Sequence, residues 1–440
     1  MSGGQFAGLT WGGIMRRTWS FLLGLLIAVF DSGATSLAQE SASPKVLSLS
    51  QALSEAAEKN PEIVTLRERV QVMRARAKQA PYLEDPEISL QTWAVPLSNP
   101  TNLGRADSNM IGIRQKVPFF GKLGLKEKIM LQEAKMAEEE LRAKEREITS
   151  KVKMTYADLF MAQKMIEINR EQLEIARAII RATEARYQVG RVTQQDVFKA
   201  LLEQSEIMNQ LIVAEEERRS AEVRLNSLSN RSPQTPIEVP GELAVPEPSL
   251  IPSSLRQEAM VHRPELRRAE QGIERAERMY DLADRNRKFP DFMLGWDYSW
   301  MPTEMNKNRY QAMVNITIPF SPWTIGRRNY EVEEALAESR AARAELDAMR
   351  NMTLREIGES LAKVQAGKKS VELFREGLLS QAELSFRAAM AAYQTGRVEF
   401  VNLLEAQRAL REARMGYFRA LVGLTQNLAD LERAVGKELP

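Results

Sequence analysis

Hydrophobic residues recur at every seventh position through two long stretches of the chain. The first series is Val152, Leu159, Ile166, Leu173, Ile180 and Tyr187. The second series is Leu403, Leu410, Tyr417, Leu424 and Leu431. Small or short polar residues lie three positions after most members of the first series, at Thr155, Ala162, Asn169, Ala176 and Thr183. A seven-residue period predicts long helices that supercoil left-handedly against partner helices, and the small residues allow a close approach.

The spacing of prolines supports the same helices. No proline lies between Pro118 and Pro233, or between Pro322 and Pro440. Because proline inside a helix costs about 3 kcal/mol, two proline-free runs predict two helical hairpins, at residues 121–229 and 326–435. The first long helix is expected over residues 121–187. At about 1.5 Å per residue, this helix would be roughly 100 Å long.

A different pattern precedes each helical hairpin: apolar and polar residues alternate with a period of two. The apolar positions are Ile88, Leu90, Ile111, Ile113, Phe292, Leu294, Trp296, Tyr298, Trp300, Tyr310, Ala312, Val314, Ile316 and Ile318. This alternation predicts β-hairpins at residues 86–118 and 290–320. Strands of a membrane barrel have one apolar and one polar face, and Tyr and Trp fit the interfacial belts. A soluble sheet with one wet face would show the same alternation, so both interpretations stay open.

The two halves of the chain are copies of one another. Three pairs of motifs match at offsets of 206, 203 and 201 positions: YQVGRV at 187 with YQTGRV at 393, NPEI at 60 with RPEL at 263, and VPF at 117 with IPF at 318. A period of this length is a duplicated half-molecule rather than a short solenoid repeat. We therefore predict a first repeat at 39–231, a linker rich in Pro, Ser and acidic residues at 232–253, and a second repeat at 254–440.

The N-terminus has the pattern of an export signal. Arg16 and Arg17 precede an apolar run at residues 19–30, and Ser36-Leu37-Ala38 offers small residues for cleavage. We predict a signal peptide at 1–38. The apolar run is short for a membrane span, although an uncleaved anchor or export by the twin-arginine route stays open. No later segment has 18 apolar residues in succession, so a mature chain that spans a membrane must do so with strands.

Composition excludes several classes of function. The net charge of +2 gives no reason to expect nucleic-acid binding. The chain has no cysteine and a single histidine, His262, so disulfides and histidine-rich metal sites are excluded. We find no phosphate-binding loop, nucleophile elbow or paired metal ligands, and therefore predict neither an enzyme nor a cofactor. The 20 methionines leave a soft-metal pathway open, but core or loop filling explains them more simply.

The turns between the paired long helices are the candidate functional sites. Gly190 and Gly396 are expected to adopt positive φ, and Thr193 with Asp196 resembles a capping box. Glu399 stands at the position of Thr193 in the second copy and gives a weaker cap. Arg191 and Arg397 are available for contacts with a partner, or for pairing with Asp196 and Glu399.

Four strands cannot close a barrel, and open sheet edges are prohibitive in lipid and invite pairing in water. Copies of the chain must therefore share their strands. Three copies would supply 12 strands, an allowed even number.

The order of these marks, duplicated along the chain, resembles the TolC family of outer-membrane efflux proteins. The marks are LSQAL at 49, NPE at 60, VPFFGK at 117, RPEL at 263 and the paired Tyr-x-x-Gly turns, over residues 49–435. The resemblance implies a homotrimer with a transmembrane β-barrel in the outer membrane and a periplasmic α-barrel. It implies passive export with a periplasmic adaptor (membrane fusion) protein and an inner-membrane pump. The pattern is most similar to the subgroup that serves heavy-metal pumps of the resistance-nodulation-division type.

The resemblance also places the adaptor contacts and the closing gate at the turns, near Gly190, Arg191, Asp196, Gly396, Arg397 and Glu399. One departure is the lack of the N-terminal lipid-modified cysteine of many relatives, which leaves anchoring to the barrel. The alternative is a periplasmic coiled-coil structural or adaptor protein. Two helical hairpins, each preceded by a strand pair, argue against an adaptor.

Overall fold

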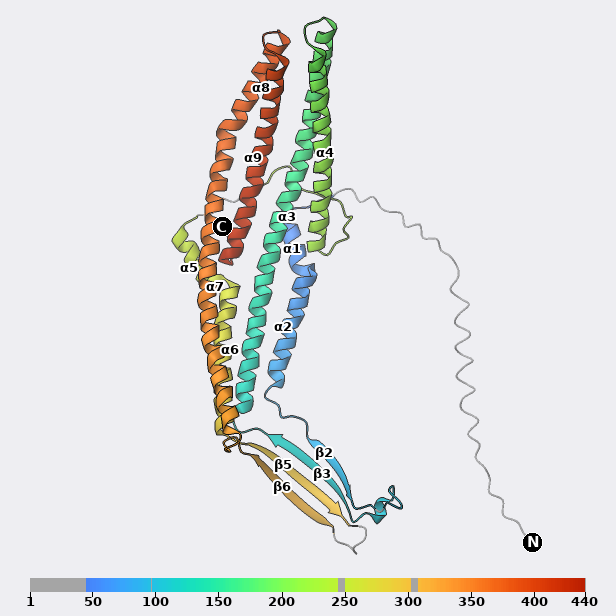
Figure 1. Ribbon diagram of the computed structural model, residues 1–440, viewed down its shortest axis with the longest axis vertical. Helices are drawn as coiled ribbons and strands as arrows, with labels where there is room; N and C mark the ends of the chain where they lie inside the picture. Colours follow the sequence, from blue (N-terminus) through green and yellow to red (C-terminus); the bar gives the residue numbers. More distant parts are fainter. Residues whose placement is uncertain (1–44, 96, 244–249, 302–307, 440) are drawn as a thin grey trace, which may run out of the picture. The chain divides into compact units, whose positions relative to one another are not determined.

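The computed structural model describes residues 45–95, 97–243, 250–301 and 308–439. The predicted signal peptide at 1–38 lies outside the described residues. Pro44–Pro440 form one compact unit, which consists mainly of long helices with a four-stranded sheet at one end (Figure 1). None of the helices in the described ranges combines the length and the apolar composition that a bilayer crossing requires.

Each repeat has the same order of elements: two consecutive helices, two strands and a long helical hairpin. In the first repeat these are α1 Leu49–Lys59, α2 Pro61–Gln79, β2 Glu87–Trp93, β3 Ser108–Val117, α3 Lys122–Gln188 and α4 Gln194–Leu228. In the second they are α5 Pro252–His262, α6 Pro264–Lys288, β5 Asp291–Trp300, β6 Arg309–Thr317, α7 Ile325–Leu373, α8 Leu379–Gln394 and α9 Phe400–Val435. The remaining elements of the described part are a 3-10 turn at Leu103–Arg105, the short strands β1 Lys45–Val46 and β4 Ile237–Glu238, and a π-helical segment at Phe374–Leu378. The expected mainly α fold with long hairpins and four strands is confirmed.

The junction between the first two helices has two features in common in both repeats, a proline in the first turn of the second helix and a side-chain bond to the return helix, although only Asn60 caps its helix. Asn60 caps α2 by accepting hydrogen bonds from the backbone N–H groups of Glu62 and Ile63, and a proline occupies the first turn of α2 and of α6. The amide of Asn60 donates to the carbonyl of Leu228 at the end of α4. Arg263, at the matching position, donates to the carbonyl of Ala434 at the end of α9. In each repeat, the residue between the first two helices thus donates a hydrogen bond to a carbonyl at the C-terminal end of the return helix of that repeat.

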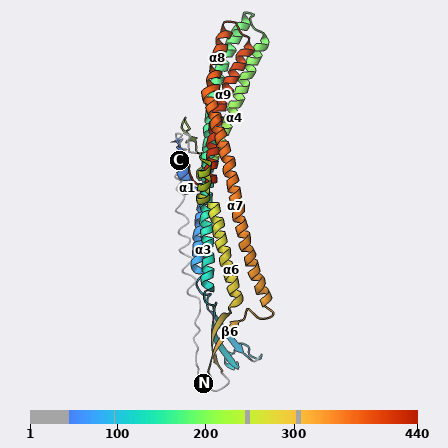
Figure 2. The ribbon, with the colours of Figure 1, turned by 90° about the vertical axis from the view of Figure 1, so that its left-hand side faces the viewer.

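The long helices pack along one another rather than around a single centre. α3 lies against α2, α4, α6 and α9, and α7 lies against α6 and α9 (Figures 1 and 2). Buried apolar residues form four separate clusters along these contacts in the described part of the chain. The small residues that flank the first seven-residue series are all buried: Thr155, Ala162, Asn169, Ala176 and Thr183. Within the series itself, Val152, Leu159, Ile166 and Ile180 are buried, whereas Tyr187 lies next to the turn and is 46% exposed.

The strands of the two repeats form one antiparallel sheet in the order β2-β3-β5-β6. The central pair, β3 and β5, joins the two copies, with Val117 opposite Phe292 and Ile113 opposite Trp296. Strands β2 and β6 are therefore the two edges of the sheet, and neither has a second strand partner within the described residues.

One feature of the second hairpin has no counterpart in the first. The helix that leads to its turn contains a π-helical segment at Phe374–Leu378, between α7 and α8. The ring of Phe374 lies over Gly416 of α9, where an added Cβ would come within 2.6 Å of the ring. The missing side chain at Gly416 therefore makes room for the phenyl ring at the widened turn.

Candidate functional site

The two turns close the long hairpins with the same backbone geometry. Gly190 has φ +69° and Gly396 has φ +75°, as expected from the sequence. The N–H of Arg191 donates to the carbonyl of Arg186 at 2.9 Å, and the N–H of Arg397 donates to the carbonyl of Ala392 at 2.9 Å. These bonds end the ascending helix through a left-handed residue, a conformation that glycine adopts without strain.

The two return helices begin differently. The carboxylate of Asp196 accepts hydrogen bonds from the backbone N–H and the hydroxyl of Thr193, at 3.0 and 2.9 Å. Glu399 is the N-cap of α9 and forms no side-chain capping bond, as its residue type predicted. Arg191 and Arg397 are exposed at the turns. Neither forms an ion pair with Asp196 or Glu399 among the contacts of the described chain, so their pairing across several copies stays a prediction.

An arginine that the sequence analysis missed connects the two turns. The guanidinium of Arg186, near the end of α3, donates to the carbonyl of Tyr393 at 2.6 Å. It also lies 4.5 Å from the centre of the Tyr393 ring, within cation–π distance. Tyr393 is fully buried, and its hydroxyl lies 3.2 Å from the hydroxyl of Thr183. We call Thr183, Arg186 and Tyr393 the turn latch, because they join the end of the first hairpin to the end of the second.

Further from the turns, ion pairs between α9 and the helices α3 and α4 also join the two hairpins. The carboxylate of Glu203 on α4 is buried and accepts from Arg408 at 2.6 Å and from Arg411 at 2.9 Å, both on α9. The hydrogen bond to Glu203 raises the pKa of Arg408 above its ordinary value. A third pair, 2.7 Å long, joins Arg414 of α9 to Glu171 of α3. A buried carboxylate with two arginine partners resists separation, because a broken pair leaves a buried charge without compensation.

The sheet has two chemically different faces. The cross-strand registers place most of the apolar residues of the four strands on one face, where Ile88 lies opposite Ile113, Ile113 opposite Trp296, and Leu294 opposite Val314. Several of these side chains are exposed, among them Ile88, Leu90, Trp296 and Val314. The opposite face is mainly polar, and it carries Ser89, Gln91, Gly112, Arg114, Asp297, Gln311 and Asn315 together with Trp93 and the methionines Met110, Met293 and Met313. An apolar exposed face backed by a polar one is typical of strands that separate lipid from water.

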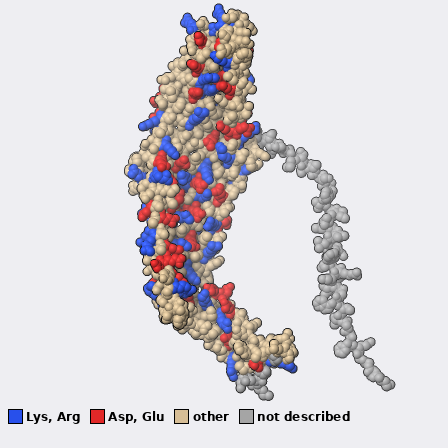
Figure 3. All heavy atoms as spheres, in the orientation of Figure 1, with Lys and Arg blue, Asp and Glu red and all other residues tan. Residues whose placement is uncertain are grey.

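The surface of the helices is charged, in contrast to the apolar face of the sheet. Charged side chains of both signs are distributed over them (Figure 3). Many of them form ion pairs along one helix, as Lys144 and Lys151 do with Glu147. The hydrogen bonds from Lys144 and Lys151 hold the pKa of Glu147 below its ordinary value. Within the described ranges, no group of three or more His, Cys, Asp or Glu side chains could hold a metal ion.

These features define a class: a chain with lipid-compatible strands at one end and long, water-compatible helical hairpins at the other. The model of the family "Outer membrane efflux protein" matches residues 52–231 and 255–437. The chain belongs to this family and is an efflux channel protein of the outer membrane. The two matched ranges leave out residues 232–254, close to the stretch that the sequence predicts as a linker.

Individual relatives agree with this assignment. The chain is 24% identical over 375 residues to the cobalt-zinc-cadmium resistance protein CzcC of Cupriavidus metallidurans, covering 83% of both chains. Among solved structures, CusC is similar with a TM-score of 0.76 and 20% identity, over 88% of this chain and 92% of CusC. VceC of Vibrio cholerae is similar with a TM-score of 0.74 and 19% identity, over 89% of this chain and 97% of VceC. The resemblance inferred from the sequence motifs is confirmed.

Proposed function

We propose that three copies of this chain form the outer-membrane conduit of a tripartite efflux system. The observation that carries the proposal is the sheet with two free edges and an exposed apolar face. Unpaired strand edges in lipid leave backbone polar groups without partners, so the sheet must close with other copies. Three sheets of four strands make a barrel of 12 strands, whose apolar face contacts the lipid of the outer membrane and whose polar face lines the pore.

The helical hairpins extend this conduit into the periplasm as an α-barrel. α3 and α7 follow directly after β3 and β6, so the wall of the pore continues from strand to helix. With 1.5 Å of rise per residue, the 67 residues of α3 span roughly 100 Å. Charged residues on both sides of the helices suit a wall that has periplasm outside and a water-filled channel inside.

The turns are the proposed gate and the contact for the adaptor protein. They carry Gly190, Arg191, Asp196, Gly396, Arg397 and Glu399, and the two arginines are exposed. The turn latch holds the two hairpins of one copy together just below these residues. We propose that adaptor binding at the turns stabilises a state in which the latch is open, because a ligand shifts a two-state equilibrium only through differential contacts.

The cargo is proposed to be metal ions, with small toxic organic compounds as the other class. The name of CzcC, a cobalt-zinc-cadmium resistance protein, supports metal ions. The driving force would come from an inner-membrane pump of the resistance-nodulation-division type. The chain itself would be a passive conduit that needs no cofactor and carries out no chemical reaction.

The proposal is tested in a strain that lacks this chain. We expect the deletion to lower the tolerated concentration of cobalt, zinc or cadmium salts, and the intact gene to restore it. A change in tolerance to organic dyes and detergents, with unchanged metal tolerance, would assign the second cargo class. Unchanged tolerance to all of these compounds would contradict the efflux function.

A further inference from the structure

A carboxylate without a partner lies on the polar face of the sheet, away from both ends of its strand. Asp297 of β5 is 4% exposed, and its Oδ1 atom is buried without a hydrogen-bond partner in the described chain. Asp297 also forms no ion pair within the described ranges. Buried charges normally have partners, because the loss of hydration is costly without them. Asp297 therefore lacks the compensation that a buried charge usually receives from its own chain.

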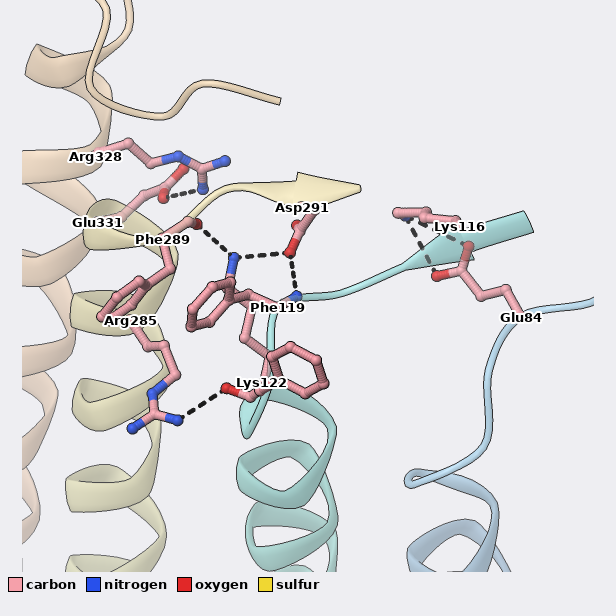
Figure 4. A network of polar contacts seen from close by, with 10 residues as sticks. Glu84, Lys116, Phe119, Lys122, Arg285, Phe289, Asp291, Arg328 and Glu331 are labelled. Carbon is pink, nitrogen blue, oxygen red and sulfur yellow. Dashed lines mark hydrogen bonds and ion pairs between the residues drawn. The ribbon is translucent and has the colours of Figure 1, made fainter. Parts of the chain in front are cut away.

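Asp291, at the start of the same strand and on the same face, has such partners. Its carboxylate accepts hydrogen bonds from the ammonium group of Lys122 at 2.8 Å and from the N–H of Phe119 at 3.0 Å (Figure 4). The carboxylate at the helix end of β5 is thus compensated within the chain. The carboxylate of Asp297, about 20 Å further along the strand, is not.

A glycine on the neighbouring strand makes room for the Asp297 side chain. Gly112 of β3 lies directly opposite Asp297, and a Cβ atom there would come within 1.9 Å of Oδ1. The hydroxyl of Ser89, which lies opposite Gly112 on β2, is 2.9 Å from the same Cβ position. Both oxygens therefore converge over the backbone of Gly112. Gln311 of β6 lies opposite Asp297 on its other side. We call Ser89, Asp297 and Gln311 the oxygen row.

The charges around the oxygen row do not cancel. Arg114 of β3 lies diagonal to Asp297, because it is opposite Gly295. No ion pair joins Arg114 to Asp297 in the described chain, and the Nε atom of Arg114 is buried without an acceptor. Glu87 lies opposite Arg114 on β2. These two adjacent rows thus carry two carboxylates and one guanidinium per chain, and their net negative charge attracts cations.

The depth of Asp297 indicates an ion pathway. Strand β5 has 10 residues, Asp291–Trp300, which is about the length that crosses the hydrocarbon layer of a membrane. Ionisable side chains at such a depth are rare, and they mark ion or substrate pathways through water-filled cavities.

The ligand chemistry of the oxygen row suits a cation that stays only briefly. Carboxylate, hydroxyl and amide oxygens bind divalent cations, and the charge of Asp297 repels anions. The row has one carboxylate per chain, and its other two donors are neutral. Conduction requires an ion to bind well enough to enter and weakly enough to leave.

We propose that the oxygen row is a transient binding site for divalent cations in the wall of the pore, and that it makes the conduit prefer cations. The inference rests on the proposed shared barrel, in which three copies place three Asp297 carboxylates at one level of the pore. Rings of carboxylates select cations in channels. The row would thus determine specificity within the membrane, far from the turns of the helical hairpins.

The test measures potassium current through the purified protein in a planar lipid bilayer, with zinc chloride as the probe. The chain has no cysteine and a single histidine, so it offers few competing ligands for zinc. We expect zinc to reduce the current of the unaltered channel reversibly, and Asp297→Asn to need about tenfold more zinc for the same reduction. In a gradient of potassium chloride, Asp297→Asn should also shift the reversal potential toward a lower preference for cations.

Two further variants separate the site from a general effect of charge. Asp107→Asn removes an exposed carboxylate just before β3, outside the oxygen row, and should respond to zinc as the unaltered channel does. Gly112→Ala keeps the charge of Asp297 but fills the space that its carboxylate occupies. We expect Gly112→Ala to weaken the zinc response as Asp297→Asn does.

Three results would overturn the site. One is an equal zinc response of Asp297→Asn and the unaltered channel. Another is an equal loss of response in Asp107→Asn, which would mean that only the net charge matters. The third is a zinc response that appears only after Arg114→Gln, which would mean that Arg114 occupies the carboxylate. Folded, unaltered protein that never conducts would instead contradict the proposed function, and the site with it.

Discussion

Arg186 binds the carbonyl and the ring of Tyr393 and so connects the two hairpin turns. Arg186→Ala removes a charged hydrogen bond, worth about 1.5–3 kcal/mol, and a cation–π contact, worth about 0.5–1 kcal/mol. We expect the turns to separate more readily and the outer membrane to admit large antibiotics, with a severalfold lower inhibitory concentration. Arg181→Ala, an exposed arginine on the same helix, is the control. Equal sensitivity of the two variants would argue against the latch.

Gly190 and Gly396 permit a second test at single residues. Valine at positive φ is strained by about 1–3 kcal/mol, and at Gly396 its Cβ would also lie 3.0 Å from the guanidinium of Arg186. We expect the double variant Gly190→Val, Gly396→Val to lose most of its export at equal surface amounts. Asparagine at both positions, which tolerates this conformation, should retain export. Normal export by the valine variant would show that the turn geometry is dispensable.

The candidate residues could be predicted only where the repeat or the residue type marks them. Paired glycines and the Thr193–Asp196 cap have local signatures, and the structure shows the expected positive φ and the bonds from Thr193 to the Asp196 carboxylate. Arg186 has no such mark, since Ala392 stands at the matching position of the second copy. Its contact depends on how the two hairpins pack, which no local pattern specifies.

At the scale of elements, the second hairpin differs from the first by its π-helical segment, where the ring of Phe374 lies over Gly416 of α9. Gly416→Ala would place a methyl group about 2.6 Å from the Phe374 ring, an overlap that must be relieved by movement. We expect a loss of stability of about 1–3 kcal/mol, measured as a lower midpoint of unfolding. Phe374→Leu in the same chain should recover part of the loss, because it removes the ring. A fully additive double variant would show that the two residues do not interact.

The helices themselves were predictable to within a residue or two. Helix α3 runs over Lys122–Gln188 against an expected 121–187, because the absence of proline and the seven-residue period leave few alternatives. The π-helical segment was not predicted, since its cause is the ring of Phe374 against Gly416 on another helix. The pairing of β3 with β5 was also not predicted, because alternation reveals the faces of a strand and not its neighbour.

At the scale of the whole molecule, the two faces of the sheet are predicted to contact different surroundings, lipid on the apolar face and water on the polar face. Val314→Arg places a charge on the apolar face, which costs about 2–4 kcal/mol near the middle of a bilayer, whereas Asn315→Arg on the opposite face faces water. We expect the first variant to be depleted severalfold from outer-membrane fractions and the second to remain near normal. The reverse order would mean that the faces are assigned to the wrong sides.

The central claim is that copies of this chain pool their strands to form one pore, and its most direct test is the conductance of the purified protein in a planar lipid bilayer. We expect discrete conductance steps from a species whose mass in detergent equals three chains, with larger steps for Arg186→Ala than for the unaltered protein. Folded, helical protein that stays a single chain and never conducts would contradict the account.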